Sequence, residues 1–286
     1  MVDFKDVFYV YNPKSPLEFE ALHDVSLHIE KGEFVALVGR TGSGKSTLVQ
    51  HINALLKPTS GSVEVNGYIN QAGLKHKGAE IMDLRRNVGL VFQFPENQLF
   101  EETVEKDVAF APKNFGFNEK EALEKAHFAL KKVGLGEDFY KRSPFELSGG
   151  EKRRVAIAGV LAFLPSVLIV DEPTAGLDPE GAKEMMYLFK EVHEEGTTVI
   201  LVTHDMNLVL SYASKVIVME NGQIAEITDP LTLFGENLDA YSLEAPLLYR
   251  LLLDLNKKGA GIDSSKIKTA DDLAKEIARK RKERGL

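Results

Sequence analysis

The stretch GRTGSGKST, residues 39–47, follows the apolar run FVALV and continues into the helical pattern STLVQHINALL. A continuous apolar run predicts a buried parallel strand, and apolar residues at helical spacing predict a helix. A G-x-x-x-x-G-K-[ST] motif in that setting predicts a phosphate-binding loop, because glycines let successive backbone N–H groups face phosphate oxygens. The nucleotide-binding residues predicted here are Gly39, Arg40, Thr41, Gly42, Ser43, Gly44, Lys45, Ser46 and Thr47.

Two side chains give this loop its predicted chemistry. Lys45 would reach the β- and γ-phosphates and so take part in catalysis, and the Ser46 hydroxyl would ligate Mg²⁺. The loop alone does not identify the nucleotide or the process that it drives, because kinases, GTPases and motor ATPases share it.

Acidic residues end a second apolar run, VLIVDEP at 167–173. Beside the phosphate loop, Asp171 would hold Mg²⁺ through water and Glu172 would act as general base on the attacking water. The alternative for this pair is an ordinary turn at a strand end. His204 ends the next predicted strand, where it would contact the γ-phosphate or simply lie on the surface.

The segment ELSGGEKRRVAIAG, residues 146–159, predicts a second anion cradle. Ser148, Gly149 and Gly150 precede a predicted helix, so a hydroxyl and free backbone N–H groups meet at a helix N-terminus. Both cradles serve one nucleotide only if a second chain supplies one of them. The sequence therefore predicts head-to-tail pairing of two subunits with the nucleotide between them.

Composition narrows the possible functions. With 35 Lys and Arg against 43 Asp and Glu, the net charge of -8 disfavours a protein that holds nucleic acid by phosphate attraction. The chain has no cysteine, which excludes disulfides and thiolate metal sites. No run reaches the roughly 18 apolar residues that a membrane helix needs. A membrane role would thus require a partner protein.

The motifs resemble, in order, those of the ABC ATPases: the phosphate loop, Gln93, LSGGE at 147–151, VLIVDEP, AGLD at 175–178 and His204. Three longer stretches resemble the second ATPase subunit (A-prime type) of the energy-coupling factor (ECF) transporters. They are VGLVFQFPENQLFEETVEKDVAF, SPFELSGGEKRRVAIAGVLA and DEPTAGLDP. The resemblance spans about residues 1–235.

This resemblance implies an α/β fold with a P-loop NTPase (RecA-like) core and an N-terminal antiparallel β subdomain. The local patterns place a helical lobe with the signature at about 100–165. We assign residues 1–235 to the ATPase domain and 236–286 to a small C-terminal extension, for which dimerisation is one candidate role. The Asn118 to Glu121 capping box and an Asn221-Gly222 hairpin are further predictions.

The resemblance also implies a function. The chain would bind and hydrolyse ATP with Mg²⁺ as a peripheral protein at the cytoplasmic face of the cell membrane. It would pair with a related second ATPase subunit, dock on a membrane transmitter protein, and power uptake of a vitamin or metal ion bound by a small membrane protein, with no nucleic acid involved. The alternatives are the ATPase of a conventional binding-protein-dependent importer and a soluble, non-transport ABC ATPase.

The family's binding residues carry over to several positions. Tyr11 matches the aromatic residue that stacks on adenine, with Tyr9 as the alternative, although both could simply fill a strand. Gln93 would contact Mg²⁺ and ATP, and its loop would transmit the presence of bound nucleotide to the transmitter protein. An apolar groove with acidic edges, suited to an arginine-bearing helix, is predicted after it, although core packing and a solvated helix start are the alternative. Its residues are Phe92, Phe94, Leu99, Phe100, Glu96, Glu101, Glu102 and Glu105.

The signature departs from the family at Glu151, where glutamine is usual. A carboxylate there would repel the γ-phosphate, so we predict that it turns toward its own helix, with Arg154 as its partner at (i, i+3) spacing. The basic tail RKRKER, residues 279–284, would either touch anionic lipid or form a solvated helix face.

Overall fold

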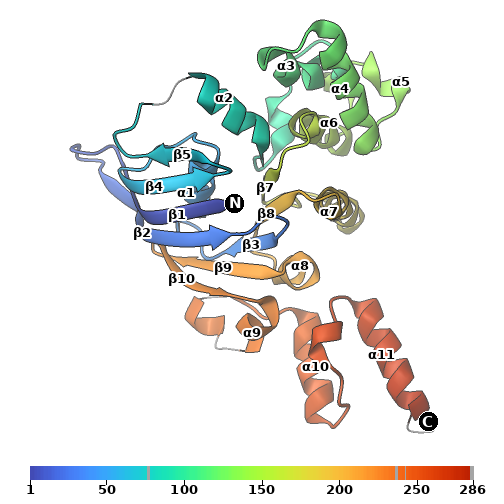
Figure 1. Ribbon diagram of the computed structural model, residues 1–286. Helices are drawn as coiled ribbons and strands as arrows, with labels where there is room; N and C mark the ends of the chain where they lie inside the picture. The colour runs from blue at the N-terminus through green and yellow to red at the C-terminus, as the bar shows by residue number, and fades with distance from the viewer. Residues whose placement is uncertain (76–77, 236–237, 242, 284–286) are drawn as a thin grey trace.

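Two sheets organise the computed structural model, which describes residues 1–75, 78–235, 238–241 and 243–283 (Figure 1). Within these residues, an antiparallel sheet has the strand order β2-β1-β4-β5. Its strands are β1 (Val2–Tyr11), β2 (Phe19–Ile29), β4 (Ser60–Val65) and β5 (Tyr68–Gln71). The N-terminal antiparallel sheet predicted from the sequence is therefore present.

The second described sheet has the order β10-β9-β3-β8-β7-β6, and only its β10 edge runs antiparallel. Its strands are β3 (Phe34–Val38), β6 (Val88–Val91), β7 (Val167–Asp171), β8 (Thr198–Val202), β9 (Lys215–Glu220) and β10 (Gln223–Thr228). Asn221 and Gly222, with φ of 49° and 79°, join β9 to β10. The predicted hairpin is confirmed, since two positive φ angles are what such a turn requires.

Helices cover the parallel sheet and form a lobe beside it, at the upper right of Figure 1. The lobe holds α3 (Val104–Asn114), α4 (Glu119–Lys132), α5 (Glu137–Tyr140) and α6 (Gly149–Leu161). The other helices are α1 (Lys45–Ile52), α2 (Gly78–Asn87), α7 (Pro179–Glu194), α8 (Met206–Tyr212), α9 (Pro230–Gly235), α10 (Leu247–Lys257) and α11 (Ala270–Glu283). The predicted capping box at the start of α4 is confirmed: Asn118 and Glu121 each accept from the other's backbone N–H.

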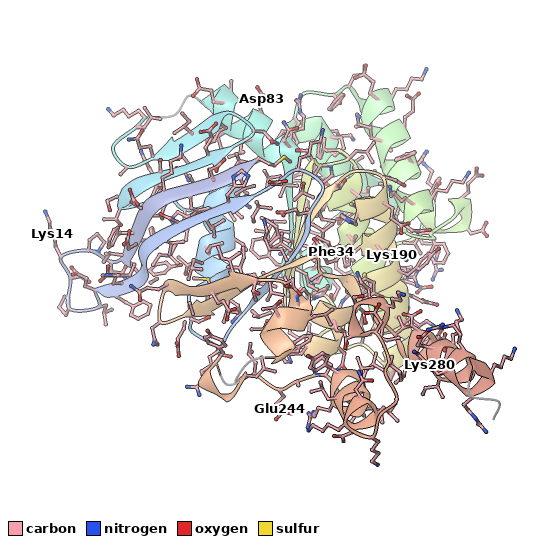
Figure 2. The ribbon with its side chains drawn as sticks, turned by 60° about the horizontal axis from the view of Figure 1, so that its bottom comes forward. Lys14, Phe34, Asp83, Lys190, Glu244 and Lys280 are labelled. Atoms are coloured by element: carbon pink, nitrogen blue, oxygen red, sulfur yellow. The ribbon has the colours of Figure 1, made fainter. Side chains whose placement is uncertain are left out.

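Strand β3 is buried on both faces, which explains its unbroken apolar sequence. Successive side chains of a strand point to opposite faces. Val35 and Leu37 pack with α1 and the antiparallel sheet. On the other face, Phe34 packs in the core of the helical lobe. Ala36 packs in the core that includes residues of helices α8, α9 and α10. Figure 2 shows Phe34 at the centre of the molecule, with Lys14 and Lys280 at its edges.

The C-terminal helices share a core with the sheet. Leu233 of α9, Leu252 of α10 and Leu273 of α11 are buried with Val216 and Val218 of β9. The division at residue 235 stays a prediction. Residues 236–237, 242 and 284–286 of the predicted extension, including the last basic residue of the tail, lie outside the described residues.

A buried histidine anchors α1, the helix that follows the phosphate loop. His51 has no exposed surface, and its Nδ1 donates to the Thr47 carbonyl at 2.7 Å. Its ring meets the Tyr9 ring edge-on at 4.8 Å. Burial lowers the pKa of His51 to about 4, although the bond to Thr47 works in the opposite direction. The imidazole is therefore neutral at physiological pH.

This burial predicts a specific pH dependence of stability. The unfolded chain takes up a proton on His51 below about pH 6.5, whereas the folded chain does not until about pH 4, so stability is lost as the pH falls through that window. Between pH 7 and 4.5, wild type should lose roughly 2–3 kcal/mol more unfolding free energy than His51→Leu. Urea unfolding at both pH values measures this difference, and parallel losses in the two proteins would refute it.

Candidate functional site

The candidate site lies at the carboxyl ends of three adjacent parallel strands. The phosphate loop follows β3, Asp171 ends β7, and His204 follows β8. Strand β8 pairs with β3 on one side and with β7 on the other, both in parallel. Parallel strands place their carboxyl ends at one edge of a sheet, where ligands of open α/β sheets bind. Residues far apart in the sequence are thus brought together.

The phosphate loop is held against neighbouring backbone. Gly39 has φ of 140°, and a side-chain carbon there would lie 2.2 Å from the Met219 carbonyl oxygen. Lys45 Nζ donates to the carbonyls of Gly39 and Arg40 at 2.7 and 2.8 Å. Burial lowers the pKa of Lys45, while the charges of Glu172 and Asp171 oppose that shift. The lysine thus lies across its own loop, beside both acids.

Two cavities open at this edge. One, of 440 Å³, brings together most of the predicted site residues: Thr41, Gly42, Gly44, Lys45, Ser46, Thr47, Gln93, Asp171, Glu172 and His204. Gly39 and Arg40 line the adjoining cavity of 770 Å³, which shares Thr41, Lys45, Glu172 and His204 with the first. Among the predicted loop residues, Ser43 is buried beneath the loop and lines neither cavity.

Oxygen atoms of Ser46 and Asp171 form the part of the site that suits a divalent cation. The Ser46 hydroxyl donates to Asp171 Oδ2 at 3.5 Å. Burial and then the charge of Glu172 raise the pKa of Asp171, whereas Ser46 and Lys45 lower it. Hard oxygen donors with excess negative charge match Mg²⁺, which takes few protein ligands beside substrate phosphates and water. The donor set therefore fits the predicted ion.

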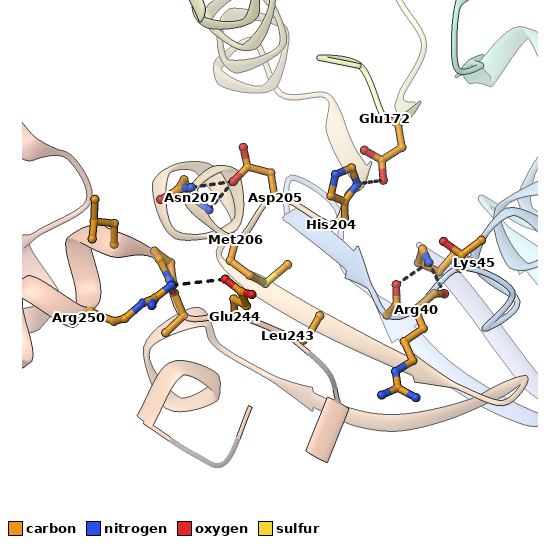
Figure 3. Close-up of a pocket in the computed structure, with 15 residues that line it drawn as sticks. Arg40, Lys45, Glu172, His204, Asp205, Met206, Asn207, Leu243, Glu244 and Arg250 are labelled. Atoms are coloured by element: carbon orange, nitrogen blue, oxygen red, sulfur yellow. Dashed lines mark hydrogen bonds and ion pairs between the residues drawn. The ribbon is translucent and has the colours of Figure 1, made fainter. Parts of the chain in front are cut away.

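Glu172 is held in an unusual backbone conformation next to His204. Its φ of 46° is uncommon for a residue other than glycine and marks local strain of a kind that gathers at functional sites. His204 Nδ1 donates to Glu172 Oε1 at 2.8 Å, because an imidazole nitrogen beside a carboxylate must carry the proton. Figure 3 shows this pair on the same side of the cavity as Lys45. The acid is thus oriented, with only 18% of its side chain exposed.

The two tyrosines predicted as alternatives have different surroundings. Tyr9 packs on the core and on His51, and burial together with Tyr11 raises its pKa. The Tyr11 hydroxyl lies 3.2 Å from the Thr47 hydroxyl, and its ring meets Tyr9 edge-on at 4.7 Å. Of the two tyrosines, Tyr11 is therefore the one that contacts the phosphate loop, through Thr47.

The second cradle caps α6. Glu151 Oε2 accepts from the backbone N and the hydroxyl of Ser148 at 2.7 and 2.8 Å. These bonds, and to a smaller extent the charges of Arg142 and Arg154, lower the pKa of Glu151. The prediction that Glu151 turns toward its own helix is confirmed.

The predicted pairing of Glu151 with Arg154 is wrong. Arg154 instead pairs with Glu184 of α7 and donates to the Val133 carbonyl at 3.1 Å. The capping box brings the carboxylate back over Ser148, and Arg154 points away toward other elements.

The two cradles of one chain are separate. Among the described residues, the walls of both cavities at the phosphate loop include neither Ser148, Gly149 nor Gly150. A side-chain carbon at either glycine would meet nothing within 4 Å, so this end of α6 faces open space. A nucleotide that contacts both kinds of cradle must lie between two chains.

The predicted acidic groove is only partly correct. A cavity of 240 Å³ includes Leu99 and Phe100 together with Phe110, and the two phenylalanines are 54% and 41% exposed. Glu96, however, is bound by Arg153, and Glu105 is buried against His127 and Lys141. Phe92 and Phe94 do not line this groove within the described structure. Glu101 and Glu102 are next to Phe100 in the sequence but do not line this cavity, and Glu102 is paired with Lys106 at 2.8 Å.

Sequence reasoning missed two parts of the site. Arg153 is buried and bonds two other segments, through Glu96 and through the carbonyls of Pro173 and Ala175. The sequence does not show which of the adjacent Arg153 and Arg154 points inward. Residues 243–247 and Arg250 of the C-terminal region form one wall of the 770 Å³ cavity, where Glu244 lies 3.5 Å from Arg250 (Figure 3). No local pattern predicts that long-range approach.

Known proteins resemble this chain in both sequence and architecture. The ABC transporter family model matches residues 22–175. The chain is 47% identical over 286 residues to the energy-coupling factor transporter ATP-binding protein EcfA2 of Lactobacillus johnsonii, with 99% of this chain and 98% of that protein covered. It is 55% identical over 236 residues to EcfA2 of Ligilactobacillus salivarius, covering 82% and 81%.

Solved structures agree. The structure of cbiO1 from Clostridium perfringens, described as part of the ABC transporter complex cbiONQ, gives a TM-score of 0.73 at 37% identity and covers 90% of this chain and 96% of that one. A dimeric ATP-binding cassette, MJ0796, in a post-hydrolysis state with ADP and Pi gives a TM-score of 0.70 at 32% sequence identity. The match covers 80% of this chain and 99% of that one. Within the described residues, no helix has the length and apolar character needed to cross a membrane. The chain belongs to the ABC transporter family, with a P-loop NTPase fold, and within it to the energy-coupling factor transporter ATP-binding proteins of the EcfA2 group.

Proposed function

We propose that the chain binds and hydrolyses ATP as one of two related ATPase subunits that power an energy-coupling factor importer. One observation carries this proposal: the phosphate loop and the LSGGE cradle of a single chain do not share a cavity. Each ATP would therefore lie between the phosphate loop of one subunit and the cradle of the other. The EcfA2 relatives favour this role over a conventional importer ATPase or a soluble ABC ATPase.

The residues at the strand ends have separate tasks in hydrolysis. Tyr11 would stack on adenine, and Lys45 with the loop amides would hold the β- and γ-phosphates. Glu172 would accept the proton of the attacking water, with His204 holding the carboxylate in place through its 2.8 Å bond. Mg²⁺ held by Ser46, Asp171 and Gln93 would neutralise charge on the phosphate oxygens.

The groove beside α3 is the surface that we assign to the membrane transmitter protein. Phe100 and Phe110, in edge contact at 4.7 Å, offer exposed apolar surface to a helix. Glu101 and Glu102, which follow Phe100 directly, would supply negative charge for an arginine on such a helix, with Glu102 also paired to Lys106. Docking there would hold the chain as a peripheral protein at the cytoplasmic face, near the small membrane protein that binds a vitamin or metal ion.

The described part of the basic tail, residues 279–283 of α11, lies away from this groove (Figure 1). Figure 1 places α11 at the end of the molecule opposite α3. A chain docked through the groove would hold α11 away from the transmitter, which favours a solvated helix face over contact with anionic lipid.

The assignment of Glu172 predicts the effect of removing the base. Glu172→Gln should abolish steady-state ATP hydrolysis while ATP still binds, because the amide keeps the size of the side chain but cannot accept the proton. Turnover and nucleotide titration measure the two effects. Lys45→Ala serves as the contrast and should lose ATP affinity. Turnover of Glu172→Gln within about threefold of wild type would exclude Glu172 as the base.

The groove assignment predicts a defect confined to assembly. Reversing Glu101 and Glu102 to lysine should weaken capture of the membrane partner in a pull-down, since complementary charge is replaced by like charge. ATP titration of the same isolated variant should give the wild-type affinity. Reversing Glu191 and Glu194 on α7 is a matched control that should leave assembly intact. Normal assembly with impaired ATP binding would assign Glu101 and Glu102 to folding instead.

The capping box predicts how the unusual signature residue behaves. Glu151→Gln should leave ATPase activity of the assembled complex unchanged or modestly raised, because glutamine also completes a capping box and holds the Ser148 hydroxyl less strongly than a carboxylate. Ser148→Arg should block closure of the ATPase pair by filling the cradle. A loss of more than about tenfold in Glu151→Gln would show that the carboxylate has a role of its own.

A further inference from the structure

Arg153 is a buried arginine whose contacts join three segments of the chain. It lies in the first turns of α6, the helix capped by the LSGGE cradle, and is 3% exposed. Its Nε and NH2 atoms donate to the two carboxylate oxygens of Glu96 at 3.0 and 2.8 Å. Its NH1 atom donates to the carbonyls of Pro173 and Ala175 at 3.3 and 2.9 Å.

Each segment that Arg153 contacts belongs to a different part of the proposed machinery. Glu96 lies in the short helix Pro95–Gln98, between Gln93 at the ATP cavity and Phe100 at the docking groove. Pro173 and Ala175 follow directly after Asp171 and Glu172. Helix α6 itself presents the cradle that would serve the ATP of the other subunit. One side chain therefore touches the docking segment, the loop after the acids and the signature helix.

The geometry is specific to arginine. A guanidinium group donates in a rigid planar fork that matches a carboxylate through two parallel bonds, and its remaining N–H groups reach two carbonyls here. The ring of Phe94 lies 5.8 Å from the guanidinium carbon and covers it. Burial raises the pKa of Glu96, but the hydrogen bonds and charge of Arg153 outweigh this and lower it overall. The pair is therefore ionised and sheltered.

We propose that Arg153 is a positioning residue that makes segment 95–98, loop 173–178 and helix α6 move as one unit. Nucleotide binding in the chain's own cavity, or docking at its groove, would then reorient the cradle that it offers to its partner. This inference rests on the proposed function for its role in transport, but the linkage itself is a property of the single chain. A lysine at this position keeps the charge and loses the fork.

The linkage is tested by hydrogen exchange on the full isolated chain, with and without Mg²⁺ and a non-hydrolysable ATP analogue. In wild type, the analogue should slow exchange in residues 39–47 and also in 95–98 and 149–154. In Arg153→Lys, the analogue should still slow exchange in residues 39–47. In the other two segments, the slowing should be at least fivefold smaller than in wild type. Arg154→Lys makes the same substitution at the neighbouring arginine, which pairs with Glu184, and should behave as wild type.

The outcomes separate clearly. Retained linked protection in Arg153→Lys, or protection confined to 39–47 in wild type, would overturn the proposal. If Arg153→Lys is unfolded, Glu96→Gln breaks the same pair from the other side and should lose protection in 149–154.

The assembled importer gives a second readout. There, Arg153→Lys should assemble normally but transport at least fivefold less substrate per ATP hydrolysed than Arg154→Lys; equal ratios would contradict the proposal. If the wild-type chain fails to assemble with a membrane partner, the proposed function fails, whereas the exchange experiment still decides whether Arg153 links the segments.

Discussion

Parallel pairing of β3 with β8, and of β8 with β7, is the constraint on which the site depends. It brings three carboxyl ends to one edge of the sheet and delivers the phosphate loop, the two acids and His204 there. Burial of β3 on both faces fixes its register, because a shift of one residue would exchange the side chains that pack with α1 for those that pack with the lobe. The chemistry follows from this register.

The same fold keeps the two predicted anion cradles of one chain in separate places. The LSGGE cradle lies on the helical lobe, its two glycines face open space, and it lines neither described cavity at the phosphate loop. We therefore propose that a second subunit supplies the cradle that completes each nucleotide site. In the proposed assembly, Arg153 would tie this exposed cradle to the segments proposed to contact nucleotide and transmitter, because it bonds Glu96, Pro173 and Ala175.

The sequence predicted what local patterns encode. Glycines, apolar runs and capping residues depend on neighbours in the chain, so the strand, loop and helix around residues 39–47, the N-terminal sheet, the buried parallel strands, the hairpin at Asn221 and the capping box at Asn118 were predicted correctly. Long-range contacts were not. Glu96 and Glu105 were interpreted as groove edges because nothing nearby in sequence indicates their partners Arg153 and Lys141. The Glu151 carboxylate accepts hydrogen bonds from Ser148. Arg154, its predicted partner, pairs with Glu184 instead.

The central claim is that this chain is one of two different ATPases that act together on a membrane partner. Native mass spectrometry of the assembly, extracted from membranes in detergent through a tag on this chain, tests it most directly. The account predicts one copy of this chain with one copy of a second, related ATPase and at least one membrane protein. Two copies of this chain without a second ATPase, or the chain without any membrane protein, would contradict it.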